Sequence, residues 1–110
     1  MALDLVIENG TVIDGSGGPR YRADVGVKAG RIVEIGRIRS AAAERIDAEG
    51  HIVSPGFIDG HTHMDAQVAW DQLGSCSCWH GVTSVVMGNC GFALAPCQPQ
   101  EREWIARCLE

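Results

Sequence analysis

Two histidines separated by a single residue, His61 and His63, are the side chains in this sequence with the clearest capacity for chemistry. In an extended backbone, residues i and i+2 project to the same side, so both imidazoles can face one metal ion. A second short segment, Gly-Asn-Cys-Gly at residues 88–91, ends another apolar stretch and places the thiol of Cys90 between glycines that permit a sharp turn. Together these residues favour a metal-dependent hydrolase.

Two apolar strands must position these side chains. Phe57 and Ile58 show no polar alternation, as expected of a strand covered on both faces, and residues 83–87 predict a second strand of this kind. Between them, residues 71–80 predict a helix that ends at Gly81. A strand, a crossover and another buried strand predict the opening βα unit of a parallel α/β sheet or barrel. In such folds the working residues follow the carboxyl ends of the strands, so the histidine pair and Cys90 should face one site.

Each of these residues also has a purely structural interpretation. A pair of exposed histidines is more often solvated surface than a metal site, and a free cysteine is most often a small buried side chain. Asp59 and Asp65 flank the histidines, and either carboxylate could orient an imidazole by accepting its N–H. Asp65 could equally be a solvated loop residue. His51 and His80 have no partner motif, so we interpret both as surface or structural residues.

The first half of the chain is rich in short strands separated by turn residues, which predicts a series of hairpins. Three are expected: residues 3–7 and 11–13 around Asn9-Gly10, residues 23–28 and 31–35 around Ala29-Gly30, and residues 45–47 and 51–54 around Glu49-Gly50. The character changes at Pro55, so the chain divides into a β-rich subdomain over residues 1–54 and a second part over residues 55–110. Near the end, residues 101–109 predict a short amphipathic helix.

Composition excludes several classes of partner. The formal net charge is −5 and Lys28 is the single lysine, which argues against nucleic acid or an anionic membrane surface as partner. No window approaches the roughly 20 apolar residues of a membrane span, and the first residues do not have the pattern of a signal peptide. The expected compartment is therefore the cytoplasm. The five cysteines are expected to be reduced thiols there.

With these motifs in order, the chain resembles the amino-terminal part of a metal-dependent amidohydrolase. The matching segments are DLVIENGTVID at 4–14, VKAGRI at 27–32, DAEG at 47–50, and VSPGFID at 53–59 before His-Thr-His. Within that superfamily, GVTSVV at 81–86 and GNCGFALAP at 88–96 resemble the N-acyl-D-amino-acid deacylase branch.

The resemblance implies a fold, a cofactor and a substrate. The fold would be α/β, with a β-sandwich-like composite subdomain followed by the first βα units of a TIM-type (β/α)8 barrel that is truncated here. His61 and His63 would ligate one metal position, Cys90 would be a zinc ligand, and the complete enzyme would hold one or two Zn²⁺ ions. Two further histidines and an acid/base aspartate are expected beyond residue 110, so the isolated chain should have little or no activity. The expected substrate is an N-acyl-D-amino acid or a related small amide.

Two other interpretations stay open at this point. The chain could be a non-catalytic β-rich module that forms homo-oligomers through unpaired strand edges. It could also be a small metal-binding protein that uses His61, His63 and Cys90 without catalysis.

Overall fold

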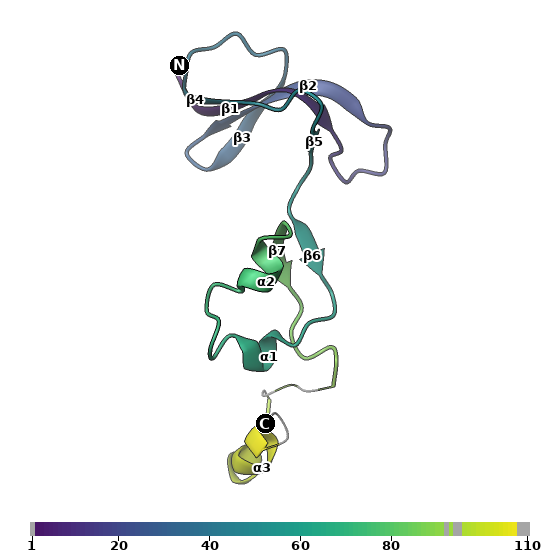
Figure 1. The fold of residues 1–110 in the computed structure, drawn as a ribbon, viewed down its shortest axis with the longest axis vertical. Helices are drawn as coiled ribbons and strands as arrows, with labels where there is room; N and C mark the ends of the chain where they lie inside the picture. Colours follow the sequence, from purple (N-terminus) through teal and green to yellow (C-terminus); the bar gives the residue numbers. More distant parts are fainter. Residues whose placement is uncertain (1, 92, 94–95, 108–110) are drawn as a thin grey trace. The chain divides into compact units, whose positions relative to one another are not determined.

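The computed structural model describes residues 2–91, 93 and 96–107, and divides into two compact units, Met1–Pro55 and Gly56–Glu110 (Figure 1). The first unit is a single mixed sheet. Its strands are β1 (Leu3–Val12), β2 (Tyr21–Lys28), β3 (Arg31–Gly36), β4 (Ala42–Asp47) and β5 (Ile52–Val53). The order is β3-β2-β1-β4, and β5 pairs with β1 beyond the end of β4. The long central strand β1 therefore organises the whole sheet.

The hairpin at Ala29-Gly30 is confirmed. β2 and β3 are antiparallel and join through these two residues, whose φ angles are 50° and 71°. Positive φ at both central residues is the signature of a type I′ turn. The main-chain N–H of Ala29 also donates to Oδ2 of Asp4 at 2.6 Å, which secures the turn to β1.

Strand β3 forms one edge of the sheet, and its residues Ile32 and Val33 are exposed. Self-association through this edge remains a prediction.

The hairpin predicted at Asn9-Gly10 is wrong, because β1 runs straight through both residues. Asn9 does take a positive φ of 64°, but the register between β1 and β2 shifts between Ile7 and Gly10, which makes a β-bulge. The main-chain N–H of Asn9 donates to Asp24 and its Nδ2 donates to Asp47, both at 2.9 Å. A type I′ turn needs positive φ at both residues, whereas this bulge needs it at Asn9 alone, and an Asn-Gly dipeptide suits either, so the dipeptide alone does not distinguish them.

The hairpin predicted around Glu49-Gly50 is also wrong. β4 and β5 do not pair with each other; both run parallel to β1, one after the other along the same edge. The turn between them lies beside the bulge, where Ala48 N donates to Glu8 O at 2.8 Å and Thr11 N donates to His51 O at 3.0 Å. A Cβ on Gly10 would lie 2.5 Å from Val53 Cγ2, so only glycine allows this close approach.

The core of this unit is small. Leu3, Val6 and Ile38 form a buried cluster against which Ala42 packs, and Val6 has no exposed surface. Gly26 lies beside this cluster, since a Cβ there would be 2.9 Å from both Leu3 Cδ1 and Ile38 Cδ1. The sheet therefore depends on a tightly filled contact between β1, β2 and the segment after β3.

Acid should weaken this sheet through Asp24. Its Oδ1 accepts from Asn9 N and its Oδ2 accepts from Ile38 N, both at 2.9 Å. These bonds hold the pKa of Asp24 below its ordinary value, and the bond from Ile38 has the larger effect. The carboxylate thus stabilises the folded state above the unfolded pKa, and this contribution is lost as the pH falls through the lower folded pKa.

We expect Asp24→Asn to destabilise the protein at pH 7 by about 1 kcal/mol, a value discounted for the partial exposure of the group. The difference between parent and variant should shrink as the pH falls from about 4 to 2. Urea unfolding followed by circular dichroism measures it. Glu44→Gln, which removes an exposed carboxylate of β4, is the charge control. A difference that stays constant down to pH 2 would contradict this role of Asp24.

The second unit contains β6 (Phe57–Asp59), α1 (Met64–Gln67), α2 (Ser75–Cys78), β7 (Val82–Val85), the 3₁₀ turn η1 (Pro99–Glu101) and α3 (Arg102–Arg107). β6 and β7 are parallel, with Ile58 opposite Ser84 and Asp59 opposite Val85. The strand, crossover and strand arrangement is confirmed. The described residues of this unit show this one strand pair, which is a fragment of α/β architecture and not a closed barrel.

Three details of this unit differ from expectation. The helix expected over residues 71–80 is reduced to the single turn of α2, which begins after Gly74 with its φ of 57°, and the other short helix, α1, precedes the expected range. Phe57 and Ile58 are 62% and 73% exposed instead of buried, because the described residues of this unit provide no layers packed over both faces of β6. The helix predicted at 101–109 begins at Arg102 and is described to Arg107; residues 108 and 109 lie outside the described residues. Within the described part of the chain, no helix is both long and apolar enough to cross a bilayer.

Candidate metal centre

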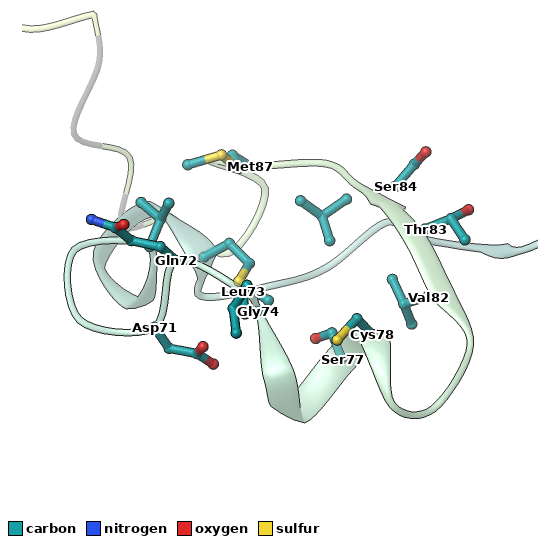
Figure 2. Close-up of a pocket in the computed structure, with 13 residues that line it drawn as sticks. Asp71, Gln72, Leu73, Gly74, Ser77, Cys78, Val82, Thr83, Ser84 and Met87 are labelled. Atoms are coloured by element: carbon teal, nitrogen blue, oxygen red, sulfur yellow. The ribbon is translucent and has the colours of Figure 1, made fainter.

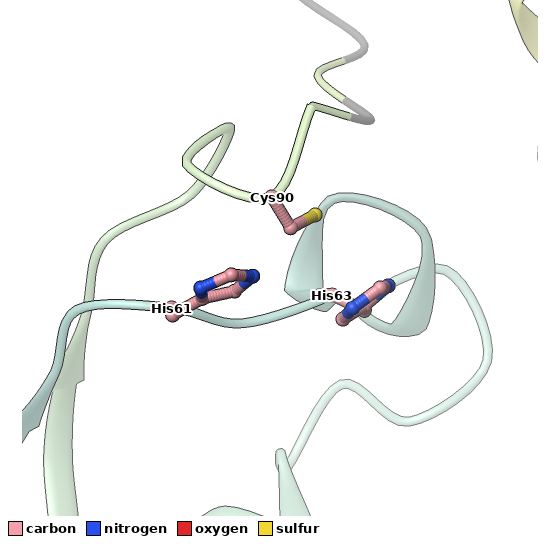
Figure 3. A group of neighbouring side chains, drawn as sticks. All are labelled: His61, His63 and Cys90. Carbon is pink, nitrogen blue, oxygen red and sulfur yellow. The ribbon is translucent and has the colours of Figure 1, made fainter.

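The two loops that follow β6 and β7 bring His61, His63 and Cys90 together. One ligand atom from each residue, an imidazole nitrogen or the Cys90 sulfur, lies within 4.8 Å of the other two. The two imidazole rings are nearly parallel, with centroids 6.4 Å apart and an interplanar angle of 21°. Figure 3 shows the Cys90 side chain extending from its turn toward both rings. The structure therefore gathers the three residues that the sequence singled out.

The parallel strand pair explains this convergence. β6 ends at Asp59 and β7 at Val85, and Val86 N donates to Asp59 O at 2.8 Å, so the two strands end at the same level. Between the histidines, Thr62 is buried, and its hydroxyl donates to Val86 O at 3.4 Å. Because Thr62 points inward, His61 and His63 are directed outward, and both are exposed.

Asp59 and Asp65 both bind main-chain amides. Asp59 Oδ1 accepts from His61 N at 3.1 Å, within its own loop. Asp65 Oδ2 accepts from Gly88 N at 2.8 Å, across to the loop that carries Cys90. Asp65 is 7% exposed, so the interpretation of it as a solvated loop residue is wrong. Orientation of an imidazole by either carboxylate remains a prediction.

Asn89 contributes a contact that sequence reasoning missed. Its Nδ2 donates to Gly60 O, the carbonyl immediately before His61. Its position in the sequence could have indicated a role at the site, since Asn89 is a polar residue between a glycine and the candidate ligand Cys90. Its partner is a main-chain carbonyl, which a sequence pattern does not reveal.

The crossover that separates the two loops is stabilised by Asp71. Its Oδ2 accepts from Gln67 Nε2 at 3.1 Å, and from Ser75 N and Oγ at 2.8 and 2.9 Å. These bonds, that from Gln67 foremost, lower the pKa of Asp71. By accepting from Ser75 N, this carboxylate also satisfies the first main-chain N–H of α2.

A cavity of about 280 Å³ lies between α2 and β7, and Figure 2 shows its lining side chains. Apolar residues such as Met64, Val82 and Met87 make up much of its wall. His61, His63 and Cys90 are not among its lining residues. This cavity is a gap in the packing of crossover against strand, and the candidate metal ligands lie outside it.

The remaining histidines and cysteines of the described residues do not join the cluster. His51 is exposed and its Nδ1 lies 3.0 Å from Glu49 O, while His80 is exposed at the end of the crossover. Cys76, Cys78, Cys90 and Cys97 are free thiols, as expected; Cys108 lies outside the described residues.

The geometry defines a class: a parallel strand pair that presents two histidines and a cysteine at the carboxyl ends of its strands, as metal-dependent hydrolases do. Two family models match the chain, the amidohydrolase family at residues 44–107 and the N-terminal domain of the urease alpha-subunit at residues 1–56. This chain belongs to the amidohydrolase family.

Individual relatives fall in the deacylase branch, which confirms the resemblance inferred from the motifs. N-acyl-D-glutamate deacylase of Alcaligenes xylosoxydans xylosoxydans is 54% identical over 95 residues, covering 86% of this chain and 20% of the relative. A D-aminoacylase structure with a binuclear metal center matches with a TM-score of 0.80 and 47% identity, over 86% of this chain and 20% of that one.

N-acyl-D-glutamate deacylase from Bordetella bronchiseptica, in complex with zinc and a phosphonate inhibitor that mimics the tetrahedral intermediate, matches with a TM-score of 0.78 and 45% identity. This match covers 88% of the present chain and 21% of that structure. The chain thus spans about a fifth of the length of these relatives.

Proposed function

We propose that this chain supplies the first metal ligands of a zinc-dependent amidohydrolase that cleaves the amide bond of N-acyl-D-amino acids. The observation that carries this proposal is the convergence of His61, His63 and Cys90 at the ends of two adjacent parallel strands. The substrate class is supported by the relatives, which include an N-acyl-D-glutamate deacylase and a D-aminoacylase.

The donor set fits zinc. Imidazole nitrogen and thiolate sulfur are its preferred ligands, at about 2.0–2.1 and 2.3 Å, and tetrahedral geometry then places the donors about 3.3–3.6 Å apart. The donor atoms lie within 4.8 Å of one another, so closure by about 1 Å brings them to that spacing. Three protein donors leave a fourth position open, as in catalytic sites and unlike closed structural ones.

When bound, zinc polarises the carbonyl of the scissile amide and activates water for attack on it. The residues of this chain would bind the zinc ion and orient its ligands. His61 and His63 must be neutral and Cys90 must lose its proton, so binding releases protons and weakens in acid. Thr62 keeps the two imidazoles on the outer side of the loop, and Asp59 fixes the main chain at His61.

The wider fold follows from the same proposal. We infer that β6 and β7 are the first two strands of a (β/α)8 barrel, and that residues 1–54 belong to a composite β-sandwich. The exposed apolar faces of Phe57 and Ile58 support this inference, because strands of such a barrel are covered on both faces. One or two zinc ions would serve the complete enzyme.

The experiment is a stereospecific hydrolysis assay of the gene product that carries these residues, at its natural length and loaded with zinc. We expect release of D-glutamate from N-acetyl-D-glutamate and little release from the L-enantiomer. His61→Ala and His63→Ala should each lower kcat/KM by at least about a hundred-fold, which corresponds to loss of metal assistance.

The control for this assay is His80→Ala, which removes an exposed histidine outside the cluster and should leave kcat/KM within about two-fold. Full activity in both His61 and His63 variants would overturn the proposal.

A further inference from the structure

We propose that Asp65 and Asn89 are positioning residues that hold Cys90 against the histidine pair, so that the three donors are assembled before a metal ion arrives. This inference rests on the proposed metal site and gives Asp65 and Asn89 a role toward Cys90, which is distinct from orientation of an imidazole. It is carried by hydrogen bonds that cross between the two loops.

Cys90 sits in a turn that has little stiffness of its own. The turn begins at Gly88 and ends at Gly91, with φ angles of 81° and 89°, and its internal bond from Gly91 N to Gly88 O is long, at 3.4 Å. Glycines with positive φ give the chain many alternatives, so such a turn needs outside contacts to keep one position.

Two contacts with residues 60–65, the segment that carries His61 and His63, supply this restraint. Asp65 Oδ2 accepts from Gly88 N at 2.8 Å, and Asn89 Nδ2 donates to Gly60 O. Gly88 and Asn89 are the two residues immediately before Cys90. On the other side, Gly60 directly precedes His61, and Asp65 is two residues after His63. The bonds therefore join the two loops on both flanks of the histidine pair, close to every donor.

The Asp65 bond is the stronger of the two restraints. The carboxylate is 7% exposed, and a charge-assisted bond to a main-chain N–H is stronger than a neutral one and less accessible to competing water when buried. Loss of an outer partner of a metal ligand commonly weakens metal affinity ten- to hundred-fold. We expect Asp65→Ala to fall in this range and Asn89→Ala near its lower end.

The first measurement is a Co²⁺ titration, read by the thiolate-to-cobalt charge-transfer absorption that only a bound sulfur gives. Asp65→Ala should weaken Co²⁺ binding about ten- to hundred-fold. Asp65→Asn keeps an oxygen that can accept from Gly88 N and should remain within about three-fold of the parent. Asp71→Ala removes a carboxylate whose bonds stay inside the crossover, and should leave the affinity within about two-fold.

The second measurement needs no metal. In metal-free protein, alkylation of Cys90 by iodoacetamide, resolved from the other thiols by mass spectrometry, should accelerate several-fold in Asp65→Ala and in Asn89→Ala. The exposed Cys76 in the same molecules should react at an unchanged rate and serves as the internal reference for the reactivity of the reagent. A general unfolding would accelerate the other partly buried thiol, Cys97, as well.

The outcomes separate this inference from the proposed function. A parent that binds Co²⁺ with the thiolate band, together with an Asp65→Ala variant of unchanged affinity and unchanged Cys90 alkylation, overturns the positioning role and leaves the metal site intact. Equal losses in Asp65→Asn and Asp65→Ala overturn the hydrogen-bond explanation. A parent that binds no Co²⁺ overturns the metal site, and the positioning role with it.

Discussion

Replacing Cys90 with serine is expected to lower the affinity of the protein for zinc by more than about a hundred-fold, beyond what loss of an outer partner costs. Serine keeps the size and position of the side chain but exchanges a soft thiolate for a hydroxyl that stays protonated near neutral pH. The two remaining donors, His61 and His63, are too few for the three-ligand sites in which zinc is catalytic.

Competition against a chromophoric zinc chelator measures this affinity. Cys78→Ser is the matched control, since Cys78 is an exposed free thiol that does not belong to the cluster, and it should leave zinc affinity within about two-fold. If Cys90→Ser holds zinc as tightly as the parent, the sulfur is not a ligand and the assignment to a deacylase-type centre loses its basis.

Replacing Gly26 with valine is expected to destabilise the protein by about 2–3 kcal/mol, the upper range for overpacking a core. A Cβ at this position lies 2.9 Å from the terminal methyl carbons of both Leu3 and Ile38, and both side chains are buried. Valine adds two further carbons to the same space. Its strand propensity is favourable, so a loss of stability isolates the packing effect.

Urea unfolding at neutral pH measures the change. Gly18→Val is the control, because Gly18 lies in a loop where the one close atom is the flexible Ser16 Oγ at 3.2 Å, and the effect there should be below about 0.5 kcal/mol. A Gly26→Val protein as stable as the parent would show that the contact between β1 and β2 can relax at little cost.

The candidate site was predictable because its geometry follows from chain direction. His61, His63 and Cys90 each follow an apolar strand, and parallel strands align their carboxyl ends, so the three donors had to approach one another. The bonds that stabilise the site were not predictable. Gly60 and Gly88 take part through main-chain atoms. Every residue has such atoms, so a pattern of side chains does not predict which of them form these bonds.

The turns of the first unit show where local patterns become ambiguous. Ala29-Gly30 was correctly assigned to a hairpin because no other strand lies between the two strands that flank it, β2 and β3, which pair directly with each other. Asn9-Gly10 satisfies the same local rule, but β1 is held on both sides by β2 and by β4 and β5, and these neighbours keep the strand continuous. Tertiary pairing, which acts over long sequence separations, decided between a hairpin and a bulge.

The exposure of Phe57 and Ile58 has a different cause. Their lack of polar alternation correctly predicted a strand, because strand formation depends on local sequence and on one neighbour. Burial depends on layers that must pack against both faces, and those are not present among the described residues of this unit. An apolar strand pattern therefore predicts a type of element more securely than it predicts how much of that element is exposed.

All three donors of the candidate centre lie within about thirty consecutive residues, in one strand-crossover-strand segment. Closing a loop of this length costs roughly 3–4 kcal/mol of chain entropy, and the cost grows only slowly with further length. A metal ion bound there during synthesis would cross-link the ends of β6 and β7 as soon as Cys90 leaves the ribosome. Metal supply would then influence the yield of folded protein, and not merely its turnover.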